Sequence, residues 1–443
     1  MRYIPNTKEE KEQMLKEIGI SSFDELINLI PEDIRVKGDL NLPEPLTEEA
    51  LKEKVYKIAE KNADFFLLKP LIGAGAYRHY IPEAVKAITT REEFYSSYTP
   101  YQPEISQGNL QSAFEFQSHI ARLTGMDVVV PSLYDGASAT AEAVLMAMRI
   151  THKNKVVISS LLHPDYKEVI RTYTAPHHTE IIEIPEENNL TDPNALNSKL
   201  TSDVAAVVIQ SPNFLGGIED ISILSGIAHS RDALLIQTVI ESISLGILSS
   251  PYDMYADIVA GESQSFGMDL NFGGPYNGYL ATKTEFLRQL PGRIVGETLD
   301  RNGKRAFVMT MRAREQDIRR EKATSNICSN HALNIVAANA YLSLMGKEGL
   351  YKVALLNTKG AHFLRNSLIE TGKFEGKDYP FFNEFVLKSK IDIDKLQETL
   401  LSHHFLPPLS VEKVYSSRKN ELLFAVTEVL SKEELASISE VIK

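Results

Sequence analysis

The sequence predicts an α/β protein built on a mostly parallel sheet, with a smaller α+β region after it. Between residues 155 and 282, short runs rich in valine and isoleucine alternate with helical or loop segments, the pattern of parallel strands joined by crossovers. Beyond residue 320, two long helical stretches precede alternating strands and helices. The 443 residues are enough for two or three domains. We therefore expect a helical arm at 1–65, a large α/β domain at 66–320 and a small α+β domain at 321–443.

Composition narrows the class of protein. The chain has 47 lysine and arginine residues against 59 aspartate and glutamate residues, a formal net charge of −12, which argues against nucleic acid as a bulk electrostatic partner. The single cysteine, Cys328, leaves no internal disulfide, and the eleven histidines show no metal-ligand spacing. No apolar run approaches the ~18 residues that span a bilayer, and the first residues lack the apolar core of a secretory signal. We expect a soluble cytoplasmic protein without a metal site.

The first 65 residues predict three helices. Thr7, followed three residues later by Glu10, predicts a capping box, and the same spacing recurs at Ser22 and Glu25. A third helix is expected after Thr47. Such an arm suits the embrace of a partner subunit, and local packing explains it equally well. The apolar residues expected to face inward from the first helix are Met14, Leu15 and Ile18.

A tyrosine loop at residues 95–109 is the first candidate binding surface. Pro100 and Pro103 stiffen it, and several tyrosines crowd around them. Aromatic hydroxyls on a stiff loop suit a preformed surface that recognises a ligand or partner. A packed loop with buried tyrosines is the alternative. The residues that we place at an active-site mouth or interface are Tyr98, Thr99, Tyr101, Gln102, Glu104, Ser106 and Gln107.

Two glycine-containing segments have a possible role in phosphate binding. Gly73 and Gly75 could begin a dinucleotide-binding fingerprint, but Arg78 stands where the third glycine is needed and no convincing strand precedes them. We reject that interpretation. Residues 136–139, with the sequence GASA, open a long predicted helix. Small residues there leave backbone N–H groups free to hold a phosphate, although they also allow simple close packing of the helix on a sheet.

A polar cluster after a buried strand marks the centre of the predicted sheet. The strand at 258–260 ends in the sequence GESQS, and a glycine-rich turn then leads to a second strand at 279–282. In open α/β sheets, ligands bind at the carboxyl ends of the strands. The cluster has the wrong spacing for a nucleophile elbow. It is therefore a binding-site candidate rather than a site for a catalytic serine.

Six segments in this order resemble one family over nearly the whole chain. They are YTPYQPEISQGNLQ, YDGASA, SPNFLGGIED, GESQSFG, FGGPYNGYLATK and REQDIRREKATSNIC. Together they resemble the P-protein of the glycine cleavage system, glycine dehydrogenase (decarboxylating), in the first subunit of its two-subunit form. The resemblance implies the fold of the fold-type I pyridoxal-phosphate transferases. It also implies an α₂β₂ enzyme that decarboxylates glycine and passes the aminomethyl group to the lipoyl group of the H-protein.

The resemblance also implies that the cofactor lysine lies on the sister subunit, which would bind the pyridoxal phosphate. In this chain Gln264 stands at the lysine position and cannot form an imine. Lys283 lies nearby but follows the next strand, so we reject it as a substitute. The expected vestigial cofactor site comprises Ser138 in the phosphate turn, His163 where a ring covers the cofactor, Glu241 near the position of the family's acid, and Gln264.

A basic run at residues 312–322 is the last candidate. Such a run usually coats a solvated helix, but it also resembles the family's own pattern and could meet a carboxylate, the partner subunit or the lipoyl carrier. We single out Arg312 and Arg314 for that contact. Two other functions stay open: a stand-alone pyridoxal-phosphate enzyme with an unexpected lysine, and a non-catalytic scaffold that only binds a partner.

Overall fold

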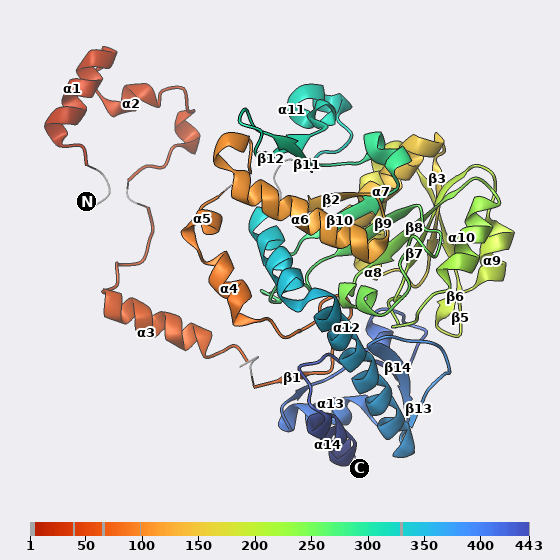
Figure 1. Cartoon of the computed structure of the whole chain (residues 1–443). Helices are drawn as coiled ribbons and strands as arrows, with labels where there is room; N and C mark the ends of the chain where they lie inside the picture. Colours follow the sequence, from red (N-terminus) through yellow and green to blue (C-terminus); the bar gives the residue numbers. More distant parts are fainter. Residues whose placement is uncertain (1–4, 39, 64–66, 98, 328–330, 443) are drawn as a thin grey trace. The chain divides into compact units, whose positions relative to one another are not determined.

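The computed structural model describes residues 5–38, 40–63, 67–97, 99–327 and 331–442. The chain falls into two compact units, Met1–Asp64 and Phe65–Lys443, and each is described by itself (Figure 1). The expected division of the second unit near residue 320 stays a prediction. Within the described residues, no helix combines the length and apolar character needed to cross a membrane.

The first unit holds the helices α1 (Lys8–Ile18), α2 (Phe23–Leu26) and α3 (Glu48–Ala59). The capping box at the start of α1 is confirmed: Thr7 accepts from the Glu10 amide, and the Glu10 side chain accepts from the Thr7 amide. The second capping box is wrong, because Ser22 makes no side-chain cap and Glu25 accepts from the amide of Ser21 instead. The inward-facing residues of α1 are wrong too, since no residue of α1 is buried. None of the described residues of this unit is buried.

A seven-stranded sheet forms the centre of the second unit, in the order β2-β10-β9-β8-β7-β3-β4. Strand β10 runs antiparallel to both its neighbours, and the other pairs are parallel. Strands β7, β9 and β10 are buried along their whole lengths, as expected when helices cover both faces of a sheet. The strands are β2 (Val128–Leu133), β3 (Lys155–Ser159), β4 (Glu180–Ile184), β7 (Val204–Gln210), β8 (Leu234–Val239), β9 (Ile258–Glu262) and β10 (Gly278–Thr282).

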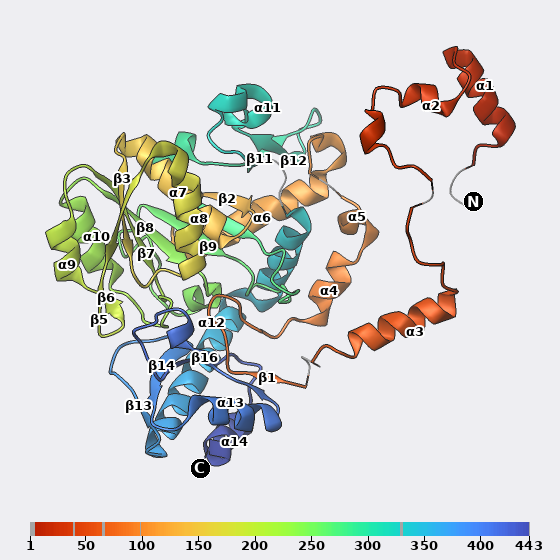
Figure 2. The same cartoon turned by 180° about the vertical axis from the view of Figure 1, so that it is seen from behind.

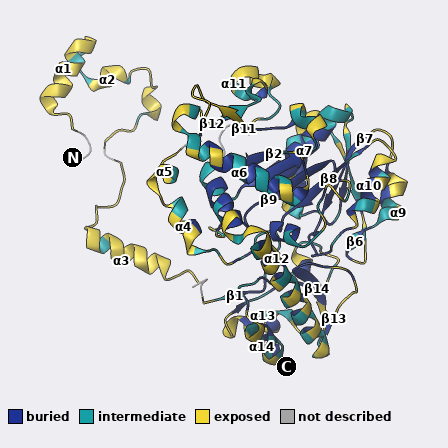
Figure 3. Cartoon of the chain, in the orientation of Figure 1, coloured by how far each residue is buried: buried dark blue, intermediate teal, exposed yellow. Residues whose placement is uncertain are grey.

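Two apolar cores lie on opposite faces of this sheet. Val207 and Ile209 of β7 belong to one core and Val208 to the other, because successive side chains of a strand point to opposite faces. The first core includes residues of α6 (Gln107–Thr124), α10 (Ile221–His229) and α12 (Ala332–Glu370). The second includes residues of α7 (Gly136–Thr151) and α8 (Pro164–Thr174). Figure 3 shows the buried sheet between these helices.

The C-terminal part of the second unit has its own antiparallel sheet, in the order β13-β14-β17-β16. Its strands are β13 (Phe374–Glu375), β14 (Glu384–Ser389), β16 (Leu409–Ser410) and β17 (Glu421–Ala425). The helices α13 (Ile393–Ser402) and α14 (Lys432–Ile442) share an apolar core with this sheet. Strand β1 (Lys69–Pro70) pairs in parallel with β15 (Phe405–Leu406). The chain therefore enters the second unit beside its C-terminal sheet, which Figure 2 shows from behind.

Several further elements complete the second unit. The hairpin of β11 (Ile294–Leu299) and β12 (Arg305–Thr310) is antiparallel. The long helix α12 is interrupted at Gly346, whose φ of 58° is not helical. The other short elements are α4 (Glu83–Thr89), α5 (Glu92–Tyr95), β5 (Glu186–Glu187), β6 (Leu190–Thr191), α9 (Pro193–Lys199) and α11 (Gln316–Arg319).

Candidate functional site

Gln264 lies just beyond the carboxyl end of β9, where an α/β sheet meets its ligand. Its side chain is buried and fully used by the backbone. The amide oxygen accepts from the Tyr77 N–H at 3.1 Å, while Nε2 donates to the carbonyls of Tyr77 and Met268, both at 2.9 Å. Gln264 thus fastens residues 71–80, which we call the plug segment, to the end of the sheet.

The N-terminus of α7, the expected phosphate turn, already holds a carboxylate. Gly136 N donates to Glu262 Oε2 at 2.9 Å, and Glu262 Oε1 accepts from the amides of Gln264 and Asn277 at 3.0 and 3.1 Å. Burial raises the pKa of Glu262 to about 7, although these backbone donors pull it the other way. Ser138 is buried beside this turn, and its amide donates to the N-cap residue Asp135 at 2.7 Å.

His163 caps the start of α8 and packs under the plug segment. Its Nδ1 accepts from the Asp165 amide at 3.2 Å, so Nε2 carries the proton and donates to the Ala74 carbonyl at 3.0 Å. The ring meets Phe214 edge-on, with centroids 5.0 Å apart. Burial lowers the pKa of His163, which suits this neutral form. The Nε2 edge of the ring therefore lies against the backbone of the plug segment.

Glu241 follows β8 and pairs with a histidine that the sequence did not single out. His79 Nε2 lies 3.0 Å from Glu241 Oε2, and His79 Nδ1 lies 2.9 Å from Glu428 Oε2. Burial alone would lower the pKa of His79, but the two carboxylates raise it to about 10. The ring is therefore an imidazolium at neutral pH and donates to both acids. No local signal marks this trio, since its members are 162 and 349 residues apart along the chain.

These residues do not fit a pyridoxal phosphate bound to this chain. Gln264 has no amine for an imine, the Gly136 N–H is already bonded to Glu262, and Glu241 is already paired with His79. Lys283 follows β10 at the opposite end of the sheet, because Thr282 pairs with Ile258 at the start of β9. Its Nζ bonds Asp257 at 2.6 Å.

The tyrosine loop has a different character. Tyr101 is 43% exposed, and the guanidinium of Arg293 lies 5.0 Å from its ring centre. Arg293 in turn pairs with Glu315 at 3.0 Å. Gln102 and Glu104 are exposed and Ser106 is half-buried, whereas Thr99 is buried. Tyr98, the remaining tyrosine of the expected mouth, lies outside the described residues.

Gln107 anchors the end of this loop to the β11–β12 hairpin. Its Nε2 donates to the carbonyls of Pro103 and Phe307 at 2.7 and 2.8 Å, and its Oε1 accepts from the Phe307 amide at 2.9 Å. Gln117, further along α6, holds Val295 of the same hairpin by the same two-way pattern. The base of the loop is therefore fixed, while its middle is exposed.

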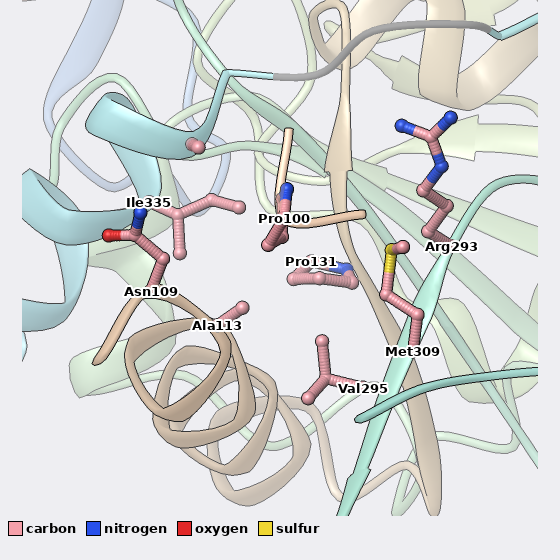
Figure 4. Close-up of a pocket in the computed structure, with 9 residues that line it drawn as sticks. Pro100, Asn109, Ala113, Pro131, Arg293, Val295, Met309 and Ile335 are labelled. Atoms are coloured by element: carbon pink, nitrogen blue, oxygen red, sulfur yellow. The ribbon is translucent and has the colours of Figure 1, made fainter. Parts of the chain in front are cut away.

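A small pocket of about 20 Å³ opens beside the loop. Figure 4 shows Pro100 and Pro131 at its centre, with Arg293 and Met309 on one side and Asn109 and Ile335 on the other. Two buried atoms nearby, Arg293 Nη1 and Glu315 Oε1, have no hydrogen-bond partner among the described residues. Buried polar atoms in folded proteins are normally paired, so this place is a candidate contact for a further group.

The basic run does not form one solvated helix. Arg314 is buried and donates to the carbonyls of Met311 and Gly292 at 3.1 and 2.8 Å. Arg312 is more exposed and pairs with Asp317 at 2.7 Å. Thus Arg314 braces the start of the run internally, and Arg312 is the better placed of the two for a contact outside the chain.

The chain is similar to known proteins over nearly its whole length. The family model "Glycine cleavage system P-protein" matches residues 1–442. The chain is 47% identical to the probable glycine dehydrogenase (decarboxylating) subunit 1 of Desulfitobacterium hafniense, over 98% of each chain. It is 44% identical to the protein of the same name from Anoxybacillus flavithermus, over 99% of this chain and 97% of the relative.

Solved structures agree on the fold. A crystal structure of glycine decarboxylase (P-protein) of the glycine cleavage system, in an inhibitor-bound form, matches with a TM-score of 0.90 at 40% identity, covering 100% of this chain and 99% of that one. A sphingosine-1-phosphate lyase from Burkholderia pseudomallei matches with a TM-score of 0.67 at 14% identity, covering 93% of each chain. At that identity the second match shows the fold alone. The fold expected from the sequence, that of the fold-type I pyridoxal-phosphate transferases, is confirmed.

Proposed function

The chain belongs to the glycine cleavage system P-protein family, and from this premise we propose that it is the lysine-free subunit of a two-subunit glycine dehydrogenase (decarboxylating). With its sister subunit it decarboxylates glycine and passes the aminomethyl group to the lipoyl group of the H-protein. The sister subunit carries the cofactor lysine and pyridoxal phosphate, and the two assemble as α₂β₂. The observation that carries this proposal is Gln264 at the lysine position, held by the backbone of Tyr77.

The tyrosine loop is the part of this chain that we assign to the partner's active site. Decarboxylation needs the bond to the carboxylate held in one orientation and water kept out of the site. Tyr101 and Gln102 are exposed residues. The Tyr101 hydroxyl accepts from Arg293 Nη2 at 3.4 Å and can still donate its own proton, so both side chains can donate neutral hydrogen bonds to a site on a neighbouring chain. The anchor at Gln107 limits the freedom that the loop loses on binding.

Arg312 is the residue of the basic run that we assign to contact with an acidic group outside the chain. Its only ion pair among the described residues is with Asp317, and that pair is partly exposed. An exposed pair costs little to break, so the guanidinium can change partner on assembly. Arg314 stays in the proposal as the internal brace that positions Arg312.

Reconstitution tests the proposal. Exchange of carbon dioxide with the glycine carboxyl is measured for this chain, for the sister subunit and for the mixture, each with pyridoxal phosphate and H-protein. We expect exchange only in the mixture. Full activity of this chain alone, with a borohydride-stable adduct on one of its lysines, would instead establish a stand-alone enzyme. Full activity of the sister subunit alone would leave this chain as a scaffold.

A further inference from the structure

We infer that the plug segment and Glu262 replace the cofactor within this chain. The imidazolium of His79 lies beside Glu241 where a pyridinium would lie, and the carboxylate of Glu262 lies at the start of α7 where a phosphate would lie. Side chains and backbone of this chain thus fill the expected cofactor site. This inference goes beyond the proposed function, because it concerns the chain by itself and holds whatever its partner does.

The glycines of the plug segment allow it to enter the place. Gly75 has a φ of +104°, and a Cβ there would lie 2.8 Å from His163 Nε2. A Cβ on Gly73 would lie 2.5 Å from the Tyr77 ring and 2.7 Å from Glu384 Oε1. Real Cβ contacts are not so short, so each glycine is needed for close approach of the backbone. The GAGA sequence that resembled a fingerprint therefore serves packing against His163.

Glu384 of β14 holds the other side of the plug segment. It is buried, and its two oxygens accept from the Ala74 amide and the Tyr77 hydroxyl, both at 2.7 Å. Burial raises its pKa to about 7. The plug segment is thus bound to the large sheet through Gln264 and to the C-terminal sheet through Glu384.

His79 completes this connection with charge. It links Glu241, at the end of β8, to Glu428, which follows β17. The backbone amide of Tyr80 adds a bond of 2.7 Å to Glu428 Oε1. A buried charge is tolerated only when it is paired, and here one cation lies between two anions. A bound ligand stabilises a protein only while it is bound. The plug segment is part of the chain, so its connection between Glu241 and Glu428 is permanent.

Anion binding to a variant tests the inference. In Glu262→Ala the Gly136 N–H loses its partner, and the start of α7 gains room for an anion. The probe is inorganic phosphate, because pyridoxal phosphate also reacts with surface lysines. The matched control is Glu219→Ala: Glu219 is likewise buried with its pKa raised by burial to about 7, but it accepts from Thr191 and Asn213 rather than from α7.

Thermal unfolding of the full chain alone, titrated with phosphate, gives the readout. We expect the apparent Kd for phosphate to be at least about tenfold lower for Glu262→Ala than for the wild type or Glu219→Ala. Equal response of the three proteins overturns the inference. If Glu262→Ala does not fold, Glu262→Gln replaces it: its side chain still fills the space beside Gly136, so it must respond to phosphate no more strongly than the wild type does. Clearly stronger stabilisation of Glu262→Gln than of the wild type by phosphate overturns the inference. None of these results depends on catalysis, so the proposed function can fail separately.

Discussion

Around Gln264, the charged side chains of His79, Glu241 and Glu262 all find hydrogen-bond partners within the chain. Beneath the tyrosine loop, Arg293 Nη1, Glu315 Oε1 and Thr99 Oγ1 have none among the described residues. In the first region the charged groups are therefore paired within the chain, although the hydroxyls of Ser244 and Ser265 there have no partner among the described residues. The second lies at the edge of the molecule and leaves buried groups unsatisfied. This difference in the pairing of charged groups is why we propose that the tyrosine loop, and not the surroundings of Gln264, contacts a partner.

The strongest way to break this comparison is to put the lysine back. Gln264→Lys introduces an ammonium among groups that need both a donor and an acceptor, since Gln264 bonds the Tyr77 amide as well as its carbonyl. We expect a loss of roughly 3–5 kcal/mol in the free energy of unfolding, from a buried unpaired charge and a lost acceptor. We also expect no imine absorbance with pyridoxal phosphate. Gln102→Lys, on the exposed loop, should change stability by less than ~0.5 kcal/mol. Denaturant unfolding and absorbance spectra measure both, and a stable, imine-forming Gln264→Lys chain contradicts the filled pocket.

The charge on His79 predicts a pH dependence of stability. The folded pKa of about 10 lies above the ordinary value of 6.5, so the stabilisation is complete below pH 6.5 and is lost as pH rises through 10. The pKa values of Glu262 and Glu384 are both raised to about 7. These two groups also lower the free energy of unfolding as pH rises, but they do so between about pH 4.5 and 7.

Denaturant unfolding between pH 7 and 9 therefore tests His79, because the buried tyrosines, whose pKa values burial raises, lower the stability only from about pH 10 upward. The groups that face it are Glu241 and Glu428, with the Tyr77 ring 6.4 Å away. We expect the wild-type free energy of unfolding to fall by a few kcal/mol over this range, at about 1.4 kcal/mol per unit of pH. The free energy of unfolding of His79→Gln should change little with pH. Parallel curves for the two proteins would falsify the imidazolium.

A glycine pair compares the two regions by packing alone. Gly75→Ala puts a methyl group 2.8 Å from His163 and keeps a φ of +104°, so we expect a loss of about 2 kcal/mol. Gly108→Ala, at the end of the tyrosine loop, meets no atom within 4 Å and should not destabilise the chain. Urea midpoints at constant slope provide the measurement. Equal effects at both positions would mean that the plug segment is not tightly packed.

The smallest expected effect is on catalysis. In the assembled enzyme, Tyr101→Phe should slow exchange of carbon dioxide with the glycine carboxyl by a few-fold to about tenfold, the worth of one neutral hydrogen bond of roughly 0.5–1.5 kcal/mol. The cofactor absorbance should stay unchanged. The rate is measured at saturating partner subunit, so that weaker assembly does not imitate slower chemistry. An unchanged rate removes Tyr101 from the active site and leaves the loop as a packing surface.

Local pattern sufficed for much of the fold. The capping box at Thr7 and the stop at Gly19, which has a left-handed φ of 84°, follow from neighbours a few residues away. The buried strands β7 and β9 follow from runs of apolar residues. The inward face of α1 could not be predicted this way, because an amphipathic pattern does not say whether a second layer of the same chain will cover it.

For the site, the family and the missing lysine could be predicted from the order of the motifs and the identity of residue 264. The groups that fill the cofactor place could be identified only in the folded chain. His79, Glu241 and Glu428 are joined across 162 and 349 residues, and Tyr77 meets Gln264 across 187. The fold brings these groups together in a water-poor interior, where burial and pairing set the charge of His79. No residue carries that information by itself, because the charge depends on neighbours that only folding supplies.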